Sequence, residues 1–379
     1  MSQTPVVVDA VRTPQGKEDG VYADVRSEDL SVPLINQLLA STGVESGQVE
    51  DLMWGCAQQR GEQGNNLARV IALLSDLGEE VPGSTMNRWC ASSAQSIMSA
   101  ADAIAAGQRE CLIAGGVESM SRVKMGENTH NVHPKIAELY NVGELQMGMT
   151  AEKVAEEFDI GREAQDEYAA RSQQRAAEAT DSGRFDDEIV PIETDDGTVS
   201  EDEGIRPGTT AEKLADLPTV FKSEGTITPG NASQVSDGAA GLMLTSKAFA
   251  EEHGLDIMAE VGSHSVAGVD PTIMGIGPVP AVEQLCERTD RDPDDYDLVE
   301  LNEAFASQTL YCQRELGFDD EAFNVNGGAI AIGHPLGASG ARLPVTLLHE
   351  MEKRKADLGL ATECVGFGQG AAIEFERVE

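Results

Sequence analysis

The chain has 379 residues, of which 27 are Lys or Arg and 66 are Asp or Glu, giving a formal net charge of −39 at pH 7. Hydrophobic residues make up 40% of the sequence, which is enough to form a core and argues against wholesale disorder. Nucleic acids and anionic membrane surfaces are bound by clustered Lys and Arg, so neither is expected as a partner.

The acidic residues are spread along the whole chain, and only 9 of the 27 basic residues are Lys. We interpret this composition as a halophilic surface, because a dense shell of hydrated carboxylates suits a cytosol with molar salt. At low salt the same charges repel one another and oppose the compact state. An acidic mesophilic protein is the alternative interpretation. The halophilic one predicts that the protein unfolds or dissociates when salt is removed.

The cysteine pattern favours a reducing compartment. No CxxC pair occurs, so no metal site is expected. The cysteines are scattered through apolar segments, which is typical of reduced thiols in the cytoplasm; they are Cys56, Cys90, Cys111, Cys286, Cys312 and Cys364. The apolar run 5–8 lacks a basic region before it and predicts a first strand rather than a signal peptide. No apolar run reaches the roughly 18 residues that span a bilayer.

The first third of the chain alternates strand and helix patterns. A segment of small residues from Cys90 to Gly107 predicts a helix that is buried and approached closely on several sides. We expect a strand at 111–114 to follow it and to end at Gly115 and Gly116. The preceding elements expected from apolar spacing are a strand at 6–9, a helix at 30–39 and a strand at 51–55.

The last third repeats this order. It predicts a helix at 279–286, a strand at 297–301, a Gly-rich turn at 327–340, a helix at 341–353 and a strand at 358–365. The matching order indicates two copies of one βαβ-type unit, each built around a buried helix. We therefore favour a duplicated α/β fold over two unrelated domains.

The middle of the chain has a different pattern. It predicts helices at 150–158 and 163–181, and an acidic tract at 186–204 that we interpret as a solvated hairpin and loops without chemistry. We therefore divide the chain into a first half at 1–118 that is completed by about 234–254, an inserted loop domain at 119–233 and a second half at 255–379.

Two residues stand out as candidates for a nucleophile and its base. Cys90 begins the small-residue helix, where backbone N–H groups, the helix dipole and nearby Arg88 are expected to lower the thiol pKa. His334 lies in a turn with five glycines nearby and can take a proton from a thiol. A buried structural Cys and a turn His bonded to the backbone are the alternatives.

Two further residues lie where strands end. Cys364 lies at the end of the last expected strand and can serve as an acid or a base, although core packing explains it at least as well. Asn302 ends the strand before it and can hold a water or a substrate oxygen, or simply cap a turn. The motifs GxSxG, GxxxxGK[ST] and a strand-borne GxGxxG are absent.

Taken together, these stretches resemble the thiolase family over nearly the whole chain. The four motifs that carry the resemblance are, in order, 87–92 (NRWCAS), 302–305 (NEAF), 333–335 (GHP) and 364–366 (CVG). The resemblance implies a five-layered αβαβα fold from two similar halves, with a loop domain inserted in the first. It also implies thiolysis of a 3-ketoacyl-CoA or the reverse condensation of two acyl-CoA molecules. Coenzyme A would be a substrate, with no prosthetic group.

The resemblance also assigns roles to residues. Cys90 would carry the acyl group, His334 would activate it and donate to the thioester oxygen of the second substrate, and Asn302 would hold the water that completes this first oxyanion hole. Cys364 would move the proton at the α-carbon, and the N–H groups of Cys90 and Gly366 would form the second oxyanion hole. Residues expected along the CoA path are Arg206, Phe221 and Ser233, and those expected in the acyl pocket are Met147, Met274 and Phe305.

The family resemblance further implies a homodimer or homotetramer, with an accessory small subunit left open. A ketoacyl synthase of the same superfold is disfavoured because that class lacks the second Cys. A catalytically silent acyl-CoA-binding subunit is disfavoured because all four loops are intact.

Three departures from the family pattern concern the site. Gln146 stands where many members have His, and Phe367 stands where Gly is common, so we expect it to narrow the pocket or to shift the second oxyanion loop. Ser93-Ala94 replaces a common Gly-Leu pair.

Overall fold

The computed structural model describes residues 3–126 and 133–378. In this part of the chain, ten strands form one sheet in the order β10-β11-β12-β9-β1-β8-β5-β3-β4, with β2 beside β8. The strands are β1 (Pro5–Arg12), β2 (Gly16–Lys17), β3 (Asp51–Gly55), β4 (Gly83–Met86), β5 (Cys111–Ser119), β8 (Ser236–Ser246), β9 (Ala259–Gly268), β10 (Leu298–Leu301), β11 (Leu358–Val365) and β12 (Gln369–Glu376).

The strand pairing shows the duplication. In the first half β1 pairs with β8 and β8 with β5, both antiparallel, and β5 pairs with β3 in parallel. In the second half β9, β12, β11 and β10 repeat this sequence of two antiparallel pairings and one parallel pairing. A short antiparallel contact between β1 and β9 joins the two halves. The prediction of two copies of one unit is therefore confirmed.

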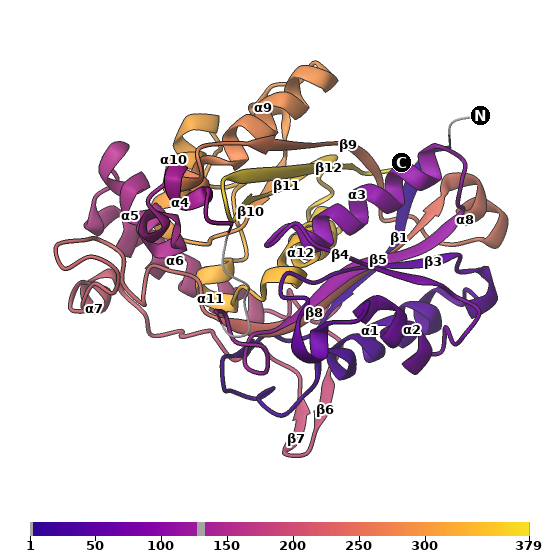
Figure 1. Ribbon diagram of the computed structural model, residues 1–379. Coiled ribbons are helices and arrows are strands. Elements are labelled where there is room, and N and C mark those ends of the chain that lie inside the picture. Colours follow the sequence, from indigo (N-terminus) through magenta and orange to yellow (C-terminus); the bar gives the residue numbers. More distant parts are fainter. Residues whose placement is uncertain (1–2, 127–132, 379) are drawn as a thin grey trace.

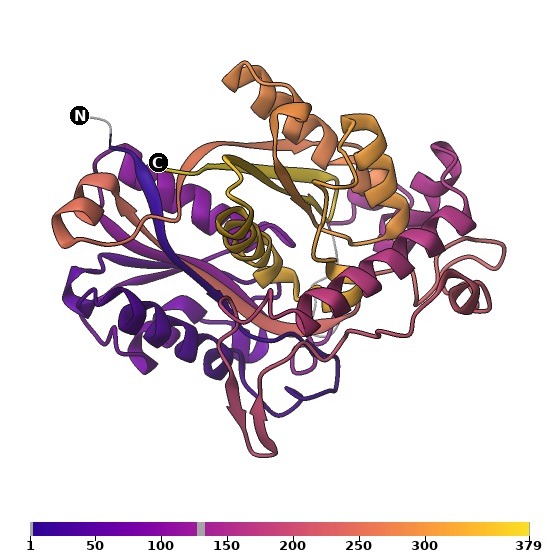
Figure 2. The same ribbon diagram turned by 180° about the vertical axis from the view of Figure 1, so that it is seen from behind.

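Helices make the other three layers (Figures 1 and 2). The helices α3 and α12 pack together between the two halves of the sheet, and the hydrophobic core around them takes side chains from both halves. The helices α1 and α2 cover the outer face of the first half, and α9 and α10 cover that of the second. The helices of these layers are α1 (Ser27–Thr42), α2 (Leu67–Leu74), α3 (Ser92–Ala105), α9 (Pro278–Thr289), α10 (Ala306–Leu316) and α12 (Leu336–Arg354), with the short α8 (Lys247–His253) and α11 (Ala329–Ile332) beside them.

The small residues of α3 serve this central position. Ala94, Ala100 and Ala101 are buried, as expected for a helix approached on several sides. Gly340 of α12 lies so close that a Cβ added there would lie 2.5 Å from the backbone nitrogen of Ala94. Small side chains on both helices therefore allow their backbones to approach closely.

Two expected element ends are wrong for the same reason. β5 continues through Gly115 and Gly116 to Ser119 instead of ending there. A Cβ on Gly115 would lie 2.2 Å from the carbonyl oxygen of Ala240, so these glycines admit close neighbours and do not make a turn. Likewise, α12 begins at Leu336 rather than at 341. The glycines at 337 and 340 lie inside this helix, where the absence of a side chain lets the backbone of neighbouring segments come close.

The segment between β5 and β8 lies beside the layered core and contains α4 (Ile136–Leu139), α5 (Met147–Glu157), α6 (Arg162–Asp181) and α7 (Ala211–Ala215). The expected hairpin is formed by β6 (Ile192–Thr194) and β7 (Gly197–Val199), which project from the molecule in Figure 1. The expectation that the whole acidic tract is solvated is wrong. Glu188 and Asp202 are buried and bind the buried Arg12 at 2.6 and 2.7 Å.

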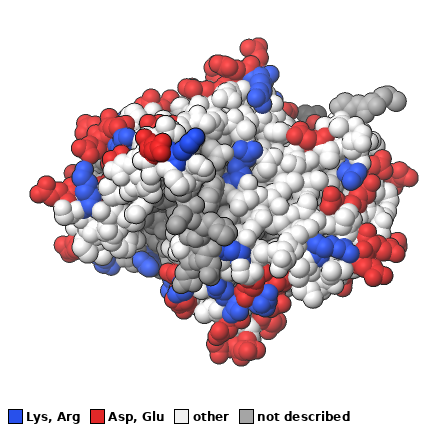
Figure 3. Space-filling view, viewed as in Figure 1, with Lys and Arg blue, Asp and Glu red and all other residues white. Residues whose placement is uncertain are grey.

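The excess of acid is visible at the surface but is not confined to it. Figure 3 shows Asp and Glu side chains gathered along the rim of one face. Others are buried, among them Glu118, Glu300, Glu303 and Glu363. In the described part of the chain, no helix is both long enough and apolar enough to cross a membrane.

Candidate active site

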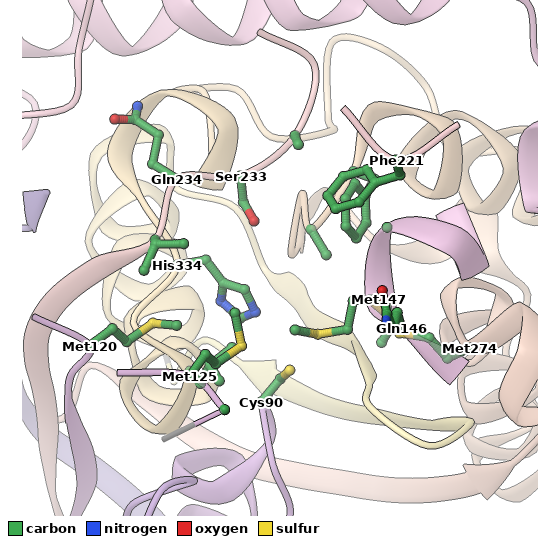
Figure 4. A pocket seen from close by; sticks show the side chains of 18 of the residues that line it. Cys90, Met120, Met125, Gln146, Met147, Phe221, Ser233, Gln234, Met274 and His334 are labelled. Atoms are coloured by element: carbon green, nitrogen blue, oxygen red, sulfur yellow. The ribbon is translucent and has the colours of Figure 1, made fainter. Parts of the chain in front are cut away.

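A cavity of about 570 Å³ opens where the two halves meet the segment between β5 and β8. Its walls are apolar and rich in sulfur, and none of the described residues that line it is Lys, Arg, Asp or Glu. Three of the predicted catalytic residues line it, namely Cys90, His334 and Cys364. In Figure 4, the thiol of Cys90 and the imidazole of His334 point into the same space.

The predicted substrate-binding residues divide into two groups. Five of them line the cavity: Met147, Phe221, Ser233, Met274 and Phe305. Phe221 and Phe305 meet edge to face, with ring centroids 6.4 Å apart. Arg206, by contrast, is exposed and does not belong to the lining. Its backbone N–H is held by the side chain of Gln173.

Cys90 lies in the loop between β4 and α3, just before the helix begins at Ser92. Its own backbone N–H and that of Gly366 both lie at its sulfur. The expected fall in the thiol pKa is wrong. Burial raises the pKa of Cys90 to about 12, and the nearby carboxylates of Glu363 and Glu118 add to this effect.

Arg88 is not among the groups that shift the pKa of Cys90 most, and its guanidinium is directed to two glutamine side chains. Its Nε donates to Gln95 Oε1 at 2.8 Å, and its Nη1 donates to Gln369 Oε1 at 3.2 Å. The thiol is therefore protonated at neutral pH, and a thiolate forms there only by proton transfer to a neighbouring group.

His334 is arranged to accept that proton. Its Nδ1 lies 2.6 Å from Ser339 Oγ, whose hydroxyl donates to the carbonyl oxygen of Pro335 at 3.0 Å. Because the hydroxyl proton is already used, Nδ1 must carry the ring proton and Nε2 keeps its lone pair. Burial, together with the positive charge of Arg342, lowers the pKa of His334 to about 3. The imidazole is therefore neutral and its Nε2 lone pair is free to accept a proton, while the lowered pKa makes it a weaker base than a free imidazole.

Asn302 contacts this imidazole from the end of β10. Its Nδ2 lies 3.3 Å from both ring nitrogens of His334. Its Oδ1 is buried and has no hydrogen-bond partner among the described residues. This oxygen is available to a donor such as a water molecule.

Cys364 lies near the end of β11 and lines the same cavity as Cys90. Burial raises the pKa of this thiol well above its ordinary value, and a negative charge on Cys90 would raise it further. The two sulfurs are therefore close enough to influence each other. Cys364 carries its proton at neutral pH and can give it away.

Sequence reasoning missed the residues that hold these groups in place. Ser339 orients the imidazole from the first turn of α12. The buried carboxylate of Glu118 accepts backbone N–H groups from Ala57 and Gly337, both at 2.9 Å, and so ties the first half to the start of α12. The only sequence signal for Ser339 is its place five residues after His334.

The glutamate of the NEAF motif has a structural part. Glu303 accepts hydrogen bonds from Tyr168 at 2.7 Å, Ser172 at 2.6 Å and the backbone N–H of Ile330 at 3.1 Å. It therefore anchors the loop of Asn302 to α6 and α11.

Of the departures from the family pattern, Gln146 lines the cavity. In the described segments no group of His, Cys, Asp and Glu is suited to hold a metal ion.

The expectation that Phe367 narrows the pocket is wrong. Its side chain is 45% exposed and does not line the cavity. It packs instead against Trp89, with ring centroids 5.7 Å apart. The turn that carries it thus leaves the cavity open.

Comparisons with known proteins agree with this geometry. The chain matches the model for the thiolase N-terminal domain over residues 5–248 and that for the thiolase C-terminal domain over residues 255–377. The chain belongs to the thiolase family. The β-ketoadipyl-CoA thiolase of Pseudomonas aeruginosa is 48% identical over 100% of both chains. The 3-ketoacyl-CoA thiolase of Cronobacter sakazakii is 46% identical over 98% of this chain and 99% of its own.

Solved structures resemble this thiolase over its whole length. The acetyl-CoA acetyltransferase of Bacillus anthracis superposes with a TM-score of 0.91 at 40% identity, covering 100% of this chain and 99% of its own. The human mitochondrial 3-ketoacyl-CoA thiolase does so with a TM-score of 0.91 at 38% identity, covering 99% of each chain. The thiolase described here is thus an acyltransferase that cleaves a 3-ketoacyl-CoA with CoA or condenses two acyl-CoA molecules.

Proposed function

We propose that Cys90 is the nucleophile of this thiolase and that His334 is its base. In the cleavage direction, the sulfur of Cys90 attacks the C3 ketone of the 3-ketoacyl-CoA while its proton passes to Nε2 of His334. Charge develops on the C3 oxygen, which the backbone N–H groups of Cys90 and Gly366 stabilise. The observation that carries this assignment is that the side chains of Cys90 and His334 line one cavity and point into the same space.

Breakage of the C2–C3 bond then leaves the acyl group on Cys90 as a thioester. The electron pair goes to C2 of the departing acetyl-CoA, and Cys364 supplies the proton there. His334, now protonated, and a water held by Asn302 stabilise the oxygen of the departing thioester. Cys364, now a thiolate, takes the proton of CoA as the CoA sulfur attacks the acyl-Cys90 thioester. The sulfur of Cys90 leaves with the proton of His334, and the acyl-CoA departs, which gives ping-pong kinetics.

The roles are tested by following the absorbance of acetoacetyl-CoA after free CoA is added in molar KCl. Cys90→Ser is expected to lower kcat by about 10⁴-fold or more, because a hydroxyl is a far weaker nucleophile than a thiol. Cys364→Ala is expected to remove turnover while Cys90 still accepts an acyl group, which mass spectrometry detects. Wild-type turnover in Cys90→Ser would overturn the mechanism.

We further propose that the transferred acyl chain is apolar. Away from Cys90, His334 and Cys364, the described lining of the cavity is mostly Met, Leu, Phe, Val and Ala, with Gln146, Ser233 and Gln234 as its polar members and no Lys or Arg among them. A chain that ends in a carboxylate, as in a ketoadipyl group, would be buried there without a counter-charge, which is costly. The test compares kcat/KM for 3-ketohexanoyl-CoA with that for 3-ketoadipyl-CoA, and a preference for the second would refute the proposal.

We propose that Arg206 meets the CoA phosphates. Arg206→Gln is therefore expected to raise KM for CoA.

We also propose a cytoplasmic homo-oligomer with a salt-dependent fold. β4 lies at the end of the sheet order and so offers an edge to a second chain. Figure 3 shows a broad uncharged area over the region of α3 and β4 in Figure 1, on an otherwise acidic protein. Light scattering at several KCl concentrations tests this proposal, and a monomer in molar KCl would refute it. Co-purification from the native host would reveal an accessory subunit.

A further inference from the structure

Two aromatic residues lie next to the two proposed backbone donors of the second oxyanion hole, one beside each donor. Both aromatic residues have an unusual backbone conformation. Trp89 precedes Cys90 with φ of 48°, and Phe367 follows Gly366 with φ of 60°. Both values lie in the left-handed region, which bulky L-residues rarely adopt. Such strain persists only where the surrounding structure holds it, and it is concentrated at functional sites.

The strain at Phe367 arises from a tight hairpin turn. β11 and β12 pair up to Val365 and Gln369, which leaves Gly366, Phe367 and Gly368 to reverse the chain. Phe367 and Gly368 both have positive φ, which in hairpin turns favours Asn or Gly at these positions. Phe367 therefore lies at a position where the backbone conformation favours Asn or Gly. Contacts of its ring must offset the free-energy cost of this conformation.

Among the described residues, the aromatic partner of this ring is Trp89. The centroids are 5.7 Å apart with the ring planes inclined by 31°. The rings stay partly open to solvent, with 37% of Trp89 and 45% of Phe367 exposed. They close no cavity and complete no core cluster in the described part of the chain. What the contact does is to join the loop that carries Cys90 to the turn that carries Gly366.

A second connection runs beside the first. Arg88 Nη1 donates to Gln369 Oε1 at 3.2 Å, and Gln369 Nε2 donates to the carbonyl oxygen of Gly366 at 3.4 Å. Asn87 Oδ1 in turn accepts the backbone N–H of Trp89 at 2.9 Å. The loop at 87–90 and the turn at 366–369 are thus joined through both a ring contact and a hydrogen-bonded path.

We propose that Trp89 and Phe367 are positioning residues that hold the N–H groups of Cys90 and Gly366 at the spacing required by one oxyanion. This inference rests on the roles proposed above for Cys90 and Gly366. The two donors come from opposite halves of the fold, so their spacing is set by contacts between the loops and not by either half alone. Displacement of one donor by about 1 Å is enough to lose roughly a hundredfold in rate.

The decisive variant is Phe367→Gly, because it removes the ring and relieves the backbone at the same time. Its free energy of unfolding is expected to stay at or above that of the wild type. Its kcat with acetoacetyl-CoA is expected to fall about ten- to a hundredfold, with KM changed less than about twofold, since the donors act on the transition state. Trp89→Leu is expected to do the same, and the double variant to be no slower than the slower single one.

Three measurements distinguish a positioning role of Trp89 and Phe367 from a merely structural role. Phe367→Tyr keeps the ring and is expected to retain wild-type kcat. Alkylation of Cys90 by iodoacetamide passes through no oxyanion and depends on the Gly366 N–H only through the thiol pKa, so its rate is expected to fall far less than kcat in Phe367→Gly. Lys355→Gly is the matched control, because it relieves a left-handed residue with φ of 61° at the end of α12; its kcat is expected to stay at the wild-type value.

Two results would overturn the proposal. One is wild-type kcat in Phe367→Gly. The other is a loss of kcat that follows dissociation in light scattering and is recovered at high protein concentration, which would assign the exposed pair to an interface between copies. Failure of the proposed mechanism would look different, because it would appear as retained turnover in Cys90→Ser.

Discussion

Replacement of Glu363 by Met is expected to stabilise this thiolase. Glu363 lies next to Cys364 on β11, so its side chain points to the opposite face of the strand, toward α3 and α12. A small cavity there is lined by Glu363 together with Ala94 and Gly340. Both carboxyl oxygens are buried and have no hydrogen-bond partner among the described residues. A buried polar group without a partner costs about 1–3 kcal/mol.

The cost is expected to depend on pH. Burial raises the pKa of Glu363 well above its ordinary value, although the positive charge of Arg342 opposes this effect. The folded state therefore holds this proton more tightly than the unfolded chain, whose Glu side chains titrate near about 4.3. Stability is then fully present below that value and is lost as pH rises toward the folded pKa, by up to about 1.4 kcal/mol per pH unit.

The assay is urea unfolding followed by circular dichroism, at fixed protein concentration in molar KCl and at several pH values from 5 to about 8. Glu363→Met is expected to be more stable than the wild type by about 1–3 kcal/mol at the lowest pH, with a gap that widens as pH rises. Glu300→Met is the contrasting control. Glu300 accepts a hydrogen bond from Arg342 Nη1 at 3.2 Å, so its removal leaves the buried guanidinium without this partner and is expected to destabilise the protein by about 1–3 kcal/mol. A gap for Glu363→Met that is zero, or the same at every pH, would refute the reasoning.

Other predictions concern the site, the buried charges and the surface. Ser339→Ala is expected to lower kcat about tenfold, since the imidazole loses the acceptor that fixes its tautomer; unchanged kcat would contradict this. Arg12→Gln leaves Glu188 and Asp202 buried without their cation and is expected to lower the free energy of unfolding by about 3–5 kcal/mol, measured in urea. Gly340→Ala is expected to lower Tm, because its Cβ would meet Ala94. Tm is expected to rise from low to molar KCl, and a constant Tm would refute the halophilic interpretation.

Much of the architecture could be predicted because its signals are local. Apolar spacing places β3 at 51–55, as observed, and locates the cores of α1, α9 and β11. The order of elements alone indicates the duplication that strand pairing confirms. β8 and β9 were not predicted, because their partners lie far away in the chain and pairing across such distances leaves no local pattern.

The site could be predicted in its reacting groups but not in its electrostatics. Cys90, His334 and Cys364 do line one cavity. The pKa of Cys90 rises because burial and two carboxylates outweigh the helix terminus, and neither is visible in a local motif. The left-handed backbone of Trp89 and Phe367 was equally hidden, since the sequence gives aromatic residues no tendency toward it.

The packing of α3 against α12 also brings together different functional groups from the two copies of the duplicated unit. In the proposed mechanism the first copy contributes the attacking sulfur of Cys90, and the second contributes His334 and Cys364, which move protons, and Asn302, which holds a water. Neither copy retains a working set, so the symmetry of the backbone is not a symmetry of chemistry. An ancestor with two identical halves would have had to specialise each half in a different direction. The contact between α3 and α12 holds the two different sets of groups in one site.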